Sequence, residues 1–156
     1  MCAFQLAGLP AEPFHALFDL SDAELGARQM RRIVATSSPG FPCRVSLADA
    51  AVGDELILLP YQHQAAGSPY QASGPIFVRR GAVQRVLPAG VVPEYVSTRL
   101  ISVRAYDPSD MIIGAEVCEG EAVASSIERI FVRTEVRYIH LHNAKRGCFS
   151  CLVQRA

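Results

Sequence analysis

The residues whose types could do chemistry gather near the C-terminal end of the sequence, in the segment YIHLHNAKRGCFSC at positions 138–151. This segment contains the imidazoles of His140 and His142, a short basic loop at 143–147 and two cysteines. Imidazoles act as acids, bases or metal ligands near neutral pH, and cysteines act as nucleophiles, redox groups or metal ligands. The residue types therefore allow a metal site, a redox site, an acid–base site or an anion-binding loop.

The two histidines stand two positions apart, which is the spacing that places side chains on one face of a strand. In a strand, Tyr138, His140 and His142 would point one way, while Ile139 and Leu141 would point the other. An H-x-H pair on one face can present two imidazoles to a metal ion, and it also occurs as two solvated or hydrogen-bonded histidines. The pattern predicts a shared imidazole face and leaves its chemistry open.

The two cysteines, Cys148 and Cys151, form a CxxC motif. In thioredoxin-like proteins such a pair sits at the start of a helix, whereas residues 148–155 here are predicted to form a strand. Cysteines three positions apart in a strand face opposite sides, so they neither form a disulfide with each other nor share a zinc ion. With an odd total of five cysteines, the sequence predicts reduced thiols, as in a cytosol.

The loop between the histidines and the cysteines carries two cations, Lys145 and Arg146, flanked by Asn143 and Gly147. Asn and Gly favour turns, and backbone amides beside an arginine fork and a lysine charge can hold a phosphate or a carboxylate. The simpler interpretation is a hairpin turn with two solvated cations. Under the first interpretation, the loop anchors a small anion.

A second polar segment, QHQAAGSPYQAS at positions 62–73, is the candidate partner of this motif. It is predicted to be a loop that continues to Gly74, and a loop of this length without its own secondary structure is often functional. It supplies His63 as a third imidazole and Ser68 and Tyr70 as hydroxyl groups. We therefore expect a site between this segment and the C-terminal motif, and the alternative is an ordered surface loop held by its prolines.

Periodicity and turn signals predict the elements that must position these residues. Ser21 and Glu24 match a capping box, which predicts a helix from Asp22 to about Ile33. Apolar residues at helical spacing predict a second helix from Glu121 to about Arg133. A helical turn is expected near 95–100. Strands are expected at 43–47, 55–61, 75–80, 99–107, 111–120, 138–144 and 148–155.

Runs of strands with two main helices, without strict alternation, predict an α+β fold with a mostly antiparallel sheet of about six to eight strands. The chain has 156 residues, half of them hydrophobic, and it shows no repeats or linker. This length and composition suit one sizeable core. The sequence therefore predicts a single globular domain over 1–156.

Composition argues against several classes of function. Lys and Arg total 15 and Asp and Glu total 15, so the chain lacks the cation excess of a nucleic-acid binder. No apolar window approaches the roughly 18 residues of a membrane span, and the N-terminal segment lacks the pattern of a secretory signal. Phosphate-binding glycine fingerprints, HExxH, GxSxG and paired CxxC motifs are missing from the sequence. We expect a cytoplasmic protein with no cofactor.

Four motifs occur in order along the chain: PGFPCRVSLADA, YQHQAAGSPYQASGPIFVR, LISVRAYD and YIHLHNAKRGCF. Together they resemble the bacterial family catalogued as domain of unknown function 1203, over about residues 9–155. The resemblance implies a bacterial, cytosolic, stand-alone domain. The family carries no assigned activity, so the resemblance implies no catalytic residues.

The leading hypothesis is a binding site for a small anionic ligand, with or without catalysis. Lys145 and Arg146 would anchor the anion. His63 or His142 would act as general acid or base, and Cys148 would be a nucleophile. The further ligand-binding residues in this hypothesis are His140, Asn143, Ser68 and Tyr70.

Two hypotheses come from other classes of function. The first is a non-catalytic interaction module, such as a homodimer, whose polar loops only join strands; the missing catalytic signatures and the neutral charge favour it. The second is a metal site built from His140, His142 and either His63 or Cys148.

Overall fold

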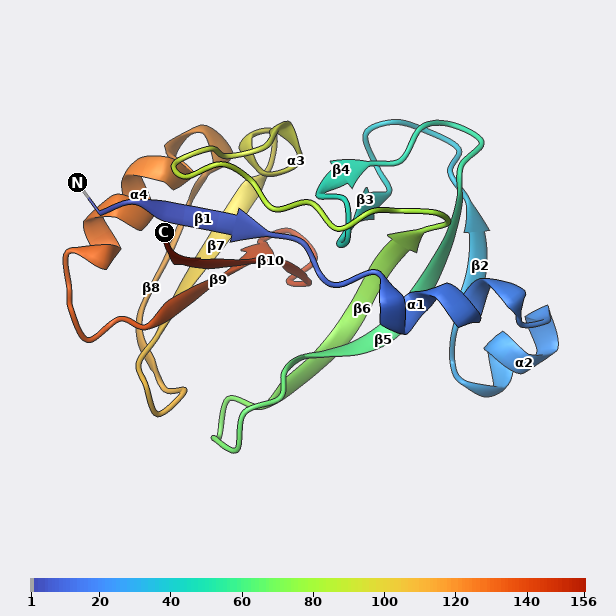
Figure 1. The fold of residues 1–156 in the computed structure, drawn as a ribbon, viewed down its shortest axis with the longest axis horizontal. Helices are drawn as coiled ribbons and strands as arrows, with labels where there is room; N and C mark the ends of the chain where they lie inside the picture. Colours follow the sequence, from blue (N-terminus) through green and yellow to red (C-terminus); the bar gives the residue numbers. More distant parts are fainter. Residues whose placement is uncertain (1) are drawn as a thin grey trace.

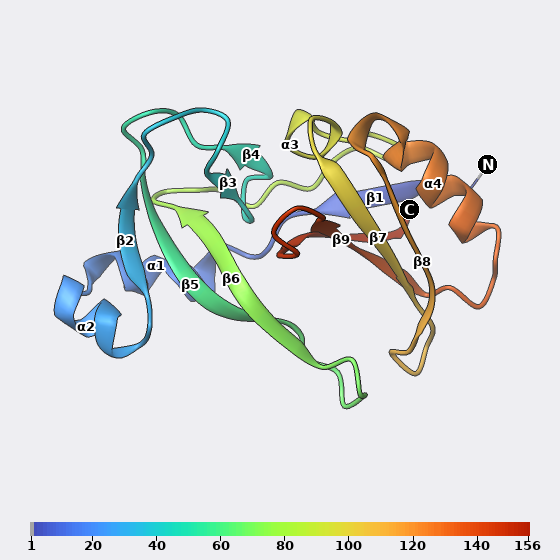
Figure 2. The same ribbon diagram turned by 180° about the vertical axis from the view of Figure 1, so that it is seen from behind.

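The computed structural model describes residues 2–156 as an α+β fold with ten strands in two five-stranded sheets. Figure 1 shows the two sheets side by side, and Figure 2 shows the same arrangement from behind. Sheet A contains, in spatial order, β1 (Phe4–Ala7), β10 (Phe149–Arg155), β9 (Tyr138–Asn143), β7 (Leu100–Tyr106) and β8 (Ile112–Glu119). Sheet B contains β2 (Arg31–Val34), β5 (Glu55–Gln64), β6 (Ala72–Arg79), β3 (Pro42–Cys43) and β4 (Ala48–Asp49).

Sheet A is antiparallel throughout and has two different faces. Its apolar face packs against α4 (Val123–Phe131), and together they form the larger hydrophobic core. Its other face carries the neighbouring cross-strand pairs Arg104–His140 and Tyr106–Tyr138. Because side chains alternate along each strand, the sheet buries aliphatic residues on one side and presents polar and aromatic residues on the other.

Sheet B is built on the hairpin of β5 and β6. β3 joins β6 in parallel through Cys43 and Phe77, and the other pairs of this sheet are antiparallel. The N-terminal helical segment, α1 (Glu12–His15) and η1 (Ala16–Asp19), packs on one face of the sheet. The second core lies there, and its members include Phe14, Leu17, Ile57, Leu59, Ile76 and Val78.

Three short helical segments complete the fold: α2 (Asp22–Ala27), α3 (Glu94–Ser97) and η2 (Gly120–Ala122). α2 begins at the predicted capping box. The Glu24 amide donates to the Ser21 hydroxyl at 3.2 Å, and the Ser21 amide donates to the Glu24 carboxylate at 2.7 Å. None of the helices within residues 2–156 has the length and apolar character that a membrane crossing needs.

The first predicted helix was too long at its C-terminal end. α2 ends at Ala27 instead of near Ile33, because Gln29 adopts a positive φ of 60° and the chain then enters β2. β2 pairs with β5 along its whole length. Tertiary pairing with a distant strand therefore decides this segment over its local helix propensity.

Two predicted boundaries in sheet B were also wrong. The strand expected at 43–47 is only Pro42–Cys43, and the chain then turns back into β4. The loop expected at 62–74 is shorter, because β5 continues to Gln64 and β6 begins at Ala72. His63, which was expected in the loop, therefore lies on strand β5.

The predicted α+β class is confirmed, but the single expected sheet of six to eight strands is replaced by two sheets. The hairpin at 99–120, the second helix and the two C-terminal strands are confirmed to within two residues at each end. Strand β1 was not predicted, since its pairing with β10 joins opposite ends of the chain. Just after β1 the two sheets are linked by backbone bonds from Gly8 to Arg85, at 2.8 Å, and from Leu9 to Arg44, at 2.9 Å.

Candidate functional site

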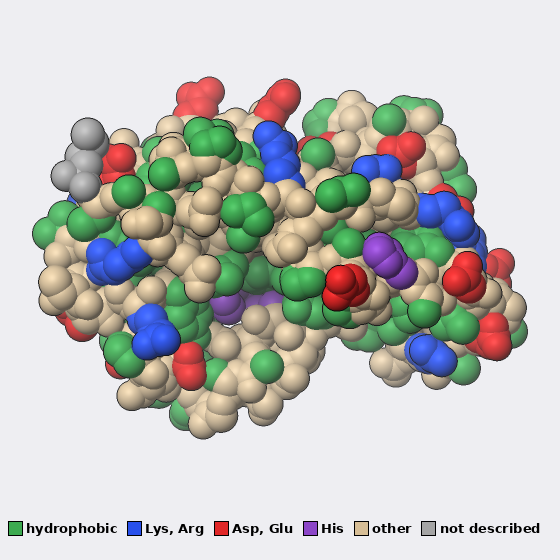
Figure 3. Space-filling model, in the orientation of Figure 1, with side chains coloured by type: hydrophobic (Ala, Val, Ile, Leu, Met, Phe, Trp, Pro, Cys, Tyr) green, Lys and Arg blue, Asp and Glu red, His purple; other side chains and the backbone are tan. Residues whose placement is uncertain are grey.

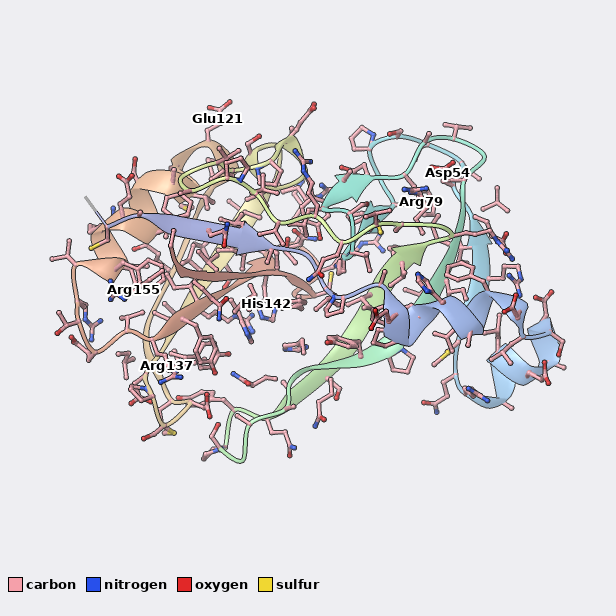
Figure 4. All side chains as sticks on the ribbon, in the orientation of Figure 1. Asp54, Arg79, Glu121, Arg137, His142 and Arg155 are labelled. Carbon is pink, nitrogen blue, oxygen red and sulfur yellow. The ribbon has the colours of Figure 1, made fainter. Side chains whose placement is uncertain are left out.

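Three histidines meet between the sheets, and we call them the imidazole cluster: His63 on β5, and His140 and His142 on β9. The ring centroid of His63 lies 5.0 Å from that of His142 and 6.3 Å from that of His140. Phe149 contacts all three rings and stacks on His63 with 5.4 Å between centroids. Figure 4 shows His142 in the region between the two sheets, and Figure 3 shows histidine atoms at the floor of a hollow near the centre of this face.

Strand alternation positions His140 and His142, the two histidines of the imidazole cluster that lie on sheet A. Tyr138, His140 and His142 share one face of β9, as predicted. Ile139 and Leu141 point the other way and are fully buried in the larger core. The two-residue period of a strand was sufficient to predict this arrangement.

A β-bulge positions His63, the histidine of the imidazole cluster that lies on sheet B. The pairing of β5 with β6 shifts between Tyr61 and Gln64, so alternation is interrupted there. As a result, two successive side chains both reach sheet A: His63 contacts the histidines of β9, and the Gln64 amide donates to the Tyr138 hydroxyl at 2.8 Å. The bulge is what brings His63 into the cluster.

Two tyrosines lie beside the imidazole cluster, since the rings of Tyr106 and Tyr138 contact His140 with 5.0 and 5.2 Å between centroids. The Tyr138 hydroxyl donates to the Asp110 carboxylate at 2.6 Å, and its ring stacks on Tyr106 with 4.9 Å between centroids. The Ser68 hydroxyl donates to the Asp110 carbonyl at 2.9 Å. Tyr70 is exposed, and its ring meets Tyr106 edge-on at 6.4 Å. Ser68 therefore ties the tip of the β5–β6 hairpin to the β7–β8 turn.

Burial keeps two of the imidazoles neutral. It lowers the pKa of His140 from 6.5 to about 3, with further lowering by the neighbouring His142, His63 and Arg104. It lowers the pKa of His142 to about 4, although a hydrogen bond to the Gly147 carbonyl acts in the opposite direction. The pKa of His63 is also lowered, mainly by burial. At neutral pH the His140 and His142 rings carry no charge.

Each ring of the cluster has a buried nitrogen with no hydrogen-bond partner among residues 2–156: Nδ1 of His63, Nδ1 of His140 and Nε2 of His142. Nδ1 of His142 lies 3.0 Å from the Gly147 carbonyl. Because a carbonyl only accepts, this Nδ1 carries the proton and Nε2 keeps a lone pair. An unpartnered buried polar group costs roughly 1–3 kcal/mol, so these nitrogens are available to a ligand or to water.

The metal hypothesis gains no support from this geometry. Within residues 2–156, no group of three or more His, Cys, Asp or Glu side chains has an arrangement that could hold a metal ion. The centroids of His140 and His142 are 6.4 Å apart, and Phe149 packs against both rings. The three imidazoles form an aromatic cluster with unpartnered nitrogens.

A pocket of about 620 Å³ lies between the two sheets, and we call it the basic pocket. Its lining comes from β3, β5, β6, the start of β7, the end of β8 and the turn between β9 and β10. Leu58, Pro75 and Phe77 give it an apolar wall. Its charged lining residues are four cations and one carboxylate: Arg44, Arg99, Lys145, Arg146 and Glu119.

Arg44 is the most unusual of these cations because it is 1% exposed. Its guanidinium donates to the carbonyls of Phe149 and Pro42, at 2.7 and 2.5 Å, and to the Cys148 sulfur, at 3.2 Å. Among residues 2–156, no carboxylate forms an ion pair with it. Arg44 is therefore a buried cation at a pocket wall, without an acidic partner in the part of the chain that the structure describes.

The other cations of the basic pocket differ in their partners. Arg99 is paired with Asp49, with 2.6 Å between Nη2 and Oδ1. Lys145 and Arg146 are exposed on the β9–β10 turn and form no ion pair within residues 2–156. The charges of Lys145 and Arg146 are therefore available to bind an anion.

The remaining polar groups of interest come from the same turn. Asn143 is 9% exposed, lines the basic pocket, and its Oδ1 has no partner among the described residues. Cys148 is half-buried and lines the pocket, whereas Cys151 is buried in the larger core. Neither cysteine is in a disulfide, as predicted, although Cys148 lies just before β10 and not within a regular strand. The CxxC motif is therefore divided between a pocket and a core.

The structure divides most of the predicted site residues between two neighbouring features, whereas Ser68 and Tyr70 belong to neither and lie at the tip of the β5–β6 hairpin. Asn143, Lys145, Arg146 and Cys148 line the basic pocket, while the three histidines form the imidazole cluster. No histidine is among the described lining residues of the pocket. The two features are joined at the turn, where Nδ1 of His142 donates to Gly147. The single site predicted between the two segments is thus an anion pocket beside a separate cluster of imidazoles.

Sequence reasoning missed Arg44 and Arg99 as pocket residues. Arg44 lies in the segment CRVSL at 43–47, where an arginine among residues of buried character is the signal that could have identified it. Arg99 is the first residue of a predicted strand and carries no comparable signal. Both reach the pocket only through contacts that join distant parts of the chain.

The fold and these two features define an α+β protein with a cation-lined pocket between two sheets. The chain belongs to the family described as protein of unknown function DUF1203, whose model matches residues 40–155. This range includes the basic pocket and the imidazole cluster, and the predicted resemblance is confirmed over residues 40–155 of the expected 9–155. No curated protein and no solved structure matches the chain.

Proposed function

We propose that the protein binds a small organic anion in the basic pocket. The observation that carries this proposal is Arg44, a buried guanidinium at the pocket wall with no acidic partner among the described residues. A buried cation is costly unless a negative charge pairs with it. A carboxylate or phosphate in the pocket would supply that charge, and Lys145 and Arg146 would meet it from the rim.

The apolar wall favours an organic anion over a bare inorganic one. Leu58, Pro75 and Phe77 line the same pocket as the cations. Ligand pockets commonly combine an apolar surface with a few polar groups that fix orientation. The ligand expected from this lining carries an acidic group at one end and an apolar body at the other.

An acid–base role for the imidazole cluster is the second candidate function, and the unpartnered ring nitrogens favour it. A general base works best when its pKa is near the working pH. The pKa values of about 3 for His140 and about 4 for His142 make these two rings weak bases. Of the three, half-buried His63 is the better acid–base group, and the two rings of β9 suit hydrogen bonding to a neutral ligand.

Titration calorimetry with inorganic phosphate and with phenyl phosphate tests the binding function. Both should bind saturably, and phenyl phosphate should bind about tenfold more tightly, because its ring buries apolar surface against Leu58 and Phe77. The double variant Lys145→Gln/Arg146→Gln should weaken both ligands by about tenfold or more, because two charge-assisted contacts are lost.

The matched control is Arg85→Gln/Arg137→Gln, which removes two exposed positive charges from outside the pocket lining. It should leave both affinities nearly unchanged. The proposal is overturned by the absence of saturable binding of either phosphate to the wild-type protein. Equal losses in the two double variants would also contradict it, since only the overall charge would then matter.

A further inference from the structure

We propose that Cys148 is a nucleophile of the basic pocket and reacts with an electrophilic carbon carried by a small organic anion. This inference rests on the proposed anion-binding function and adds a reaction class to it. In the step, the Cys148 sulfur forms a bond to the ligand carbon. The bond from that carbon to its leaving group breaks, the leaving group departs with the electron pair, and the thiol proton passes to solvent.

The position of the sulfur sets it apart from the other four cysteines. Cys148 lines the basic pocket and lies 3.2 Å from Nη2 of Arg44. Cys43 and Cys151 are buried, and half-buried Cys2 and Cys118 are not among the pocket-lining residues. Among residues 2–156, Cys148 is also the one side chain to which the Arg44 guanidinium donates, its other two acceptors being backbone carbonyls.

A second observation points independently to a ligand beside this sulfur. Oδ1 of Asn143 is buried and has no hydrogen-bond partner within residues 2–156. Asn143 lines the same pocket, and its backbone amide donates to the Cys148 carbonyl at 2.9 Å. A buried amide left unpartnered beside a pocket is available to hydrogen-bond an occupant. The sulfur, the amide and the cations therefore converge on one space.

The surrounding charges select the kind of electrophile. Arg44, Lys145 and Arg146 line the pocket without ion pairs in the described chain, and Arg99 adds a fourth, paired cation. Glu119 is the one carboxylate among the described lining residues, so positive charge predominates in the pocket. A cleft in which one sign of charge predominates concentrates ligands of the opposite sign, by about 10-fold to 1,000-fold in favourable cases. An anionic electrophile should therefore reach Cys148 faster than a neutral one of the same size.

Iodoacetate and iodoacetamide provide the test, since they differ in charge and transfer nearly the same group. The native protein is treated with each reagent, and labelling of each cysteine is followed by peptide mass spectrometry. The measured quantity is the iodoacetate rate divided by the iodoacetamide rate at one sulfur. Because both reagents attack the same thiolate, this ratio is independent of the fraction of thiol that is ionised.

The ratio at Cys148 should exceed that of a neutral thiol in solution, such as N-acetylcysteine amide, by about tenfold. Half-buried Cys118 is the internal control and should show a ratio at or below that of the reference thiol, because two carboxylates, Glu116 and Glu119, lie nearby against one cation, Arg129, which is paired with Glu116. The variant Lys145→Gln/Arg146→Gln should lower the ratio at Cys148, because two of the cations that attract the anionic reagent are removed. High salt should have the same effect, since screening weakens the attraction.

Three outcomes overturn the inference: a ratio at Cys148 no higher than at the reference thiol, no labelling of Cys148 by either reagent, or a ratio unaffected by the double variant. The proposed function is judged separately by phosphate calorimetry. If phosphate binds and Cys148 shows no preference for iodoacetate, the pocket binds anions without a nucleophile. If phosphate does not bind either, both proposals fail.

Discussion

His140 and His142 are buried as neutral rings, and this makes folding depend on pH. Above pH 6.5 the two imidazoles are neutral in the folded and the unfolded chain, so they add no pH dependence. Below pH 6.5 the unfolded chain binds protons first, because the pKa values in the folded state are about 3 and about 4. The free energy of unfolding must therefore fall as the pH falls from 6.5 towards 4.

We predict that each of these two histidines lowers the free energy of unfolding by about 1.4 kcal/mol per pH unit below pH 6.5. Urea denaturation at several values between pH 7.5 and pH 5 measures the slope. Four carboxylates have lowered pKa values and act below this window, since their unfolded-state value is 4.5: Glu24, Glu55, Glu116 and Glu135. The variant His142→Gln should have a shallower slope, and an unchanged slope would contradict the prediction.

At the scale of elements, two glycines show how the same substitution acts in different surroundings. Gly26 lies in α2, and a Cβ atom added there would meet no atom within 4 Å. Gly120 begins η2, and a Cβ atom there would lie 2.2 Å from the Val96 carbonyl and 2.6 Å from the Arg99 carbonyl. The second glycine is required by the close approach of the α3 backbone, and the first is not.

We predict that Gly26→Ala raises the free energy of unfolding by about 0.5–1 kcal/mol, because alanine is the better helix former and restricts the unfolded chain. Gly120→Ala should lower it by about 3 kcal/mol or more, because backbone atoms would have to move. Thermal or urea unfolding of both variants measures the difference. Equal effects of the two substitutions would show that the close packing around η2 is not a constraint.

For the whole molecule, the two sheets are held together at several separate places. Arg44, on the segment after β3, donates to the Phe149 carbonyl of β10. At a second place, Gln64 of β5 donates to Tyr138 of β9, which donates to Asp110. The bonds from Arg44 to Phe149 and from Gln64 to Tyr138 each join residues that are more than 70 positions apart in the sequence.

We predict that Tyr138→Phe lowers the free energy of unfolding by about 1–3 kcal/mol, because buried Gln64 loses its acceptor. Hydrogen exchange should become faster in the β5–β6 hairpin, which the bond ties to sheet A. Tyr70→Phe is the matched control: Tyr70 is 38% exposed, and the loss of its hydroxyl should change stability by less than about 0.5 kcal/mol. Equal effects would mean that the hydroxyl of Tyr138 does not link the sheets.

Features that depend on neighbours in sequence were predicted well. The shared face of Tyr138, His140 and His142 follows from the two-residue period of a strand, and the start of α2 follows from a capping box within four residues. The first two features are local, so no knowledge of the rest of the fold was required. The two cysteines of the CxxC motif are separated as predicted, but for another reason, since Cys148 precedes β10 and a register shift lies between Phe149 and Cys151.

Features that depend on distant contacts were not predicted. The end of α2 is decided by the pairing of β2 with β5, and the position of His63 by a bulge between β5 and β6. Helix propensity predicted a longer first helix, and loop composition predicted a loop at His63. Neither property contains information about the partner strand. The division of the strands into two sheets also depends on contacts between distant parts of the chain.

The sequence by itself determined the imidazole face, the basic turn, the α+β class and the family resemblance, because local periodicity and residue order encode them. Only the tertiary structure decided that the cations and the imidazoles occupy separate places, and that buried Arg44 joins Lys145 and Arg146 at one pocket. The physical reason is that a pocket between two sheets is made by register and packing. These place Arg44 next to Phe149 and Cys148, more than a hundred positions away in the chain.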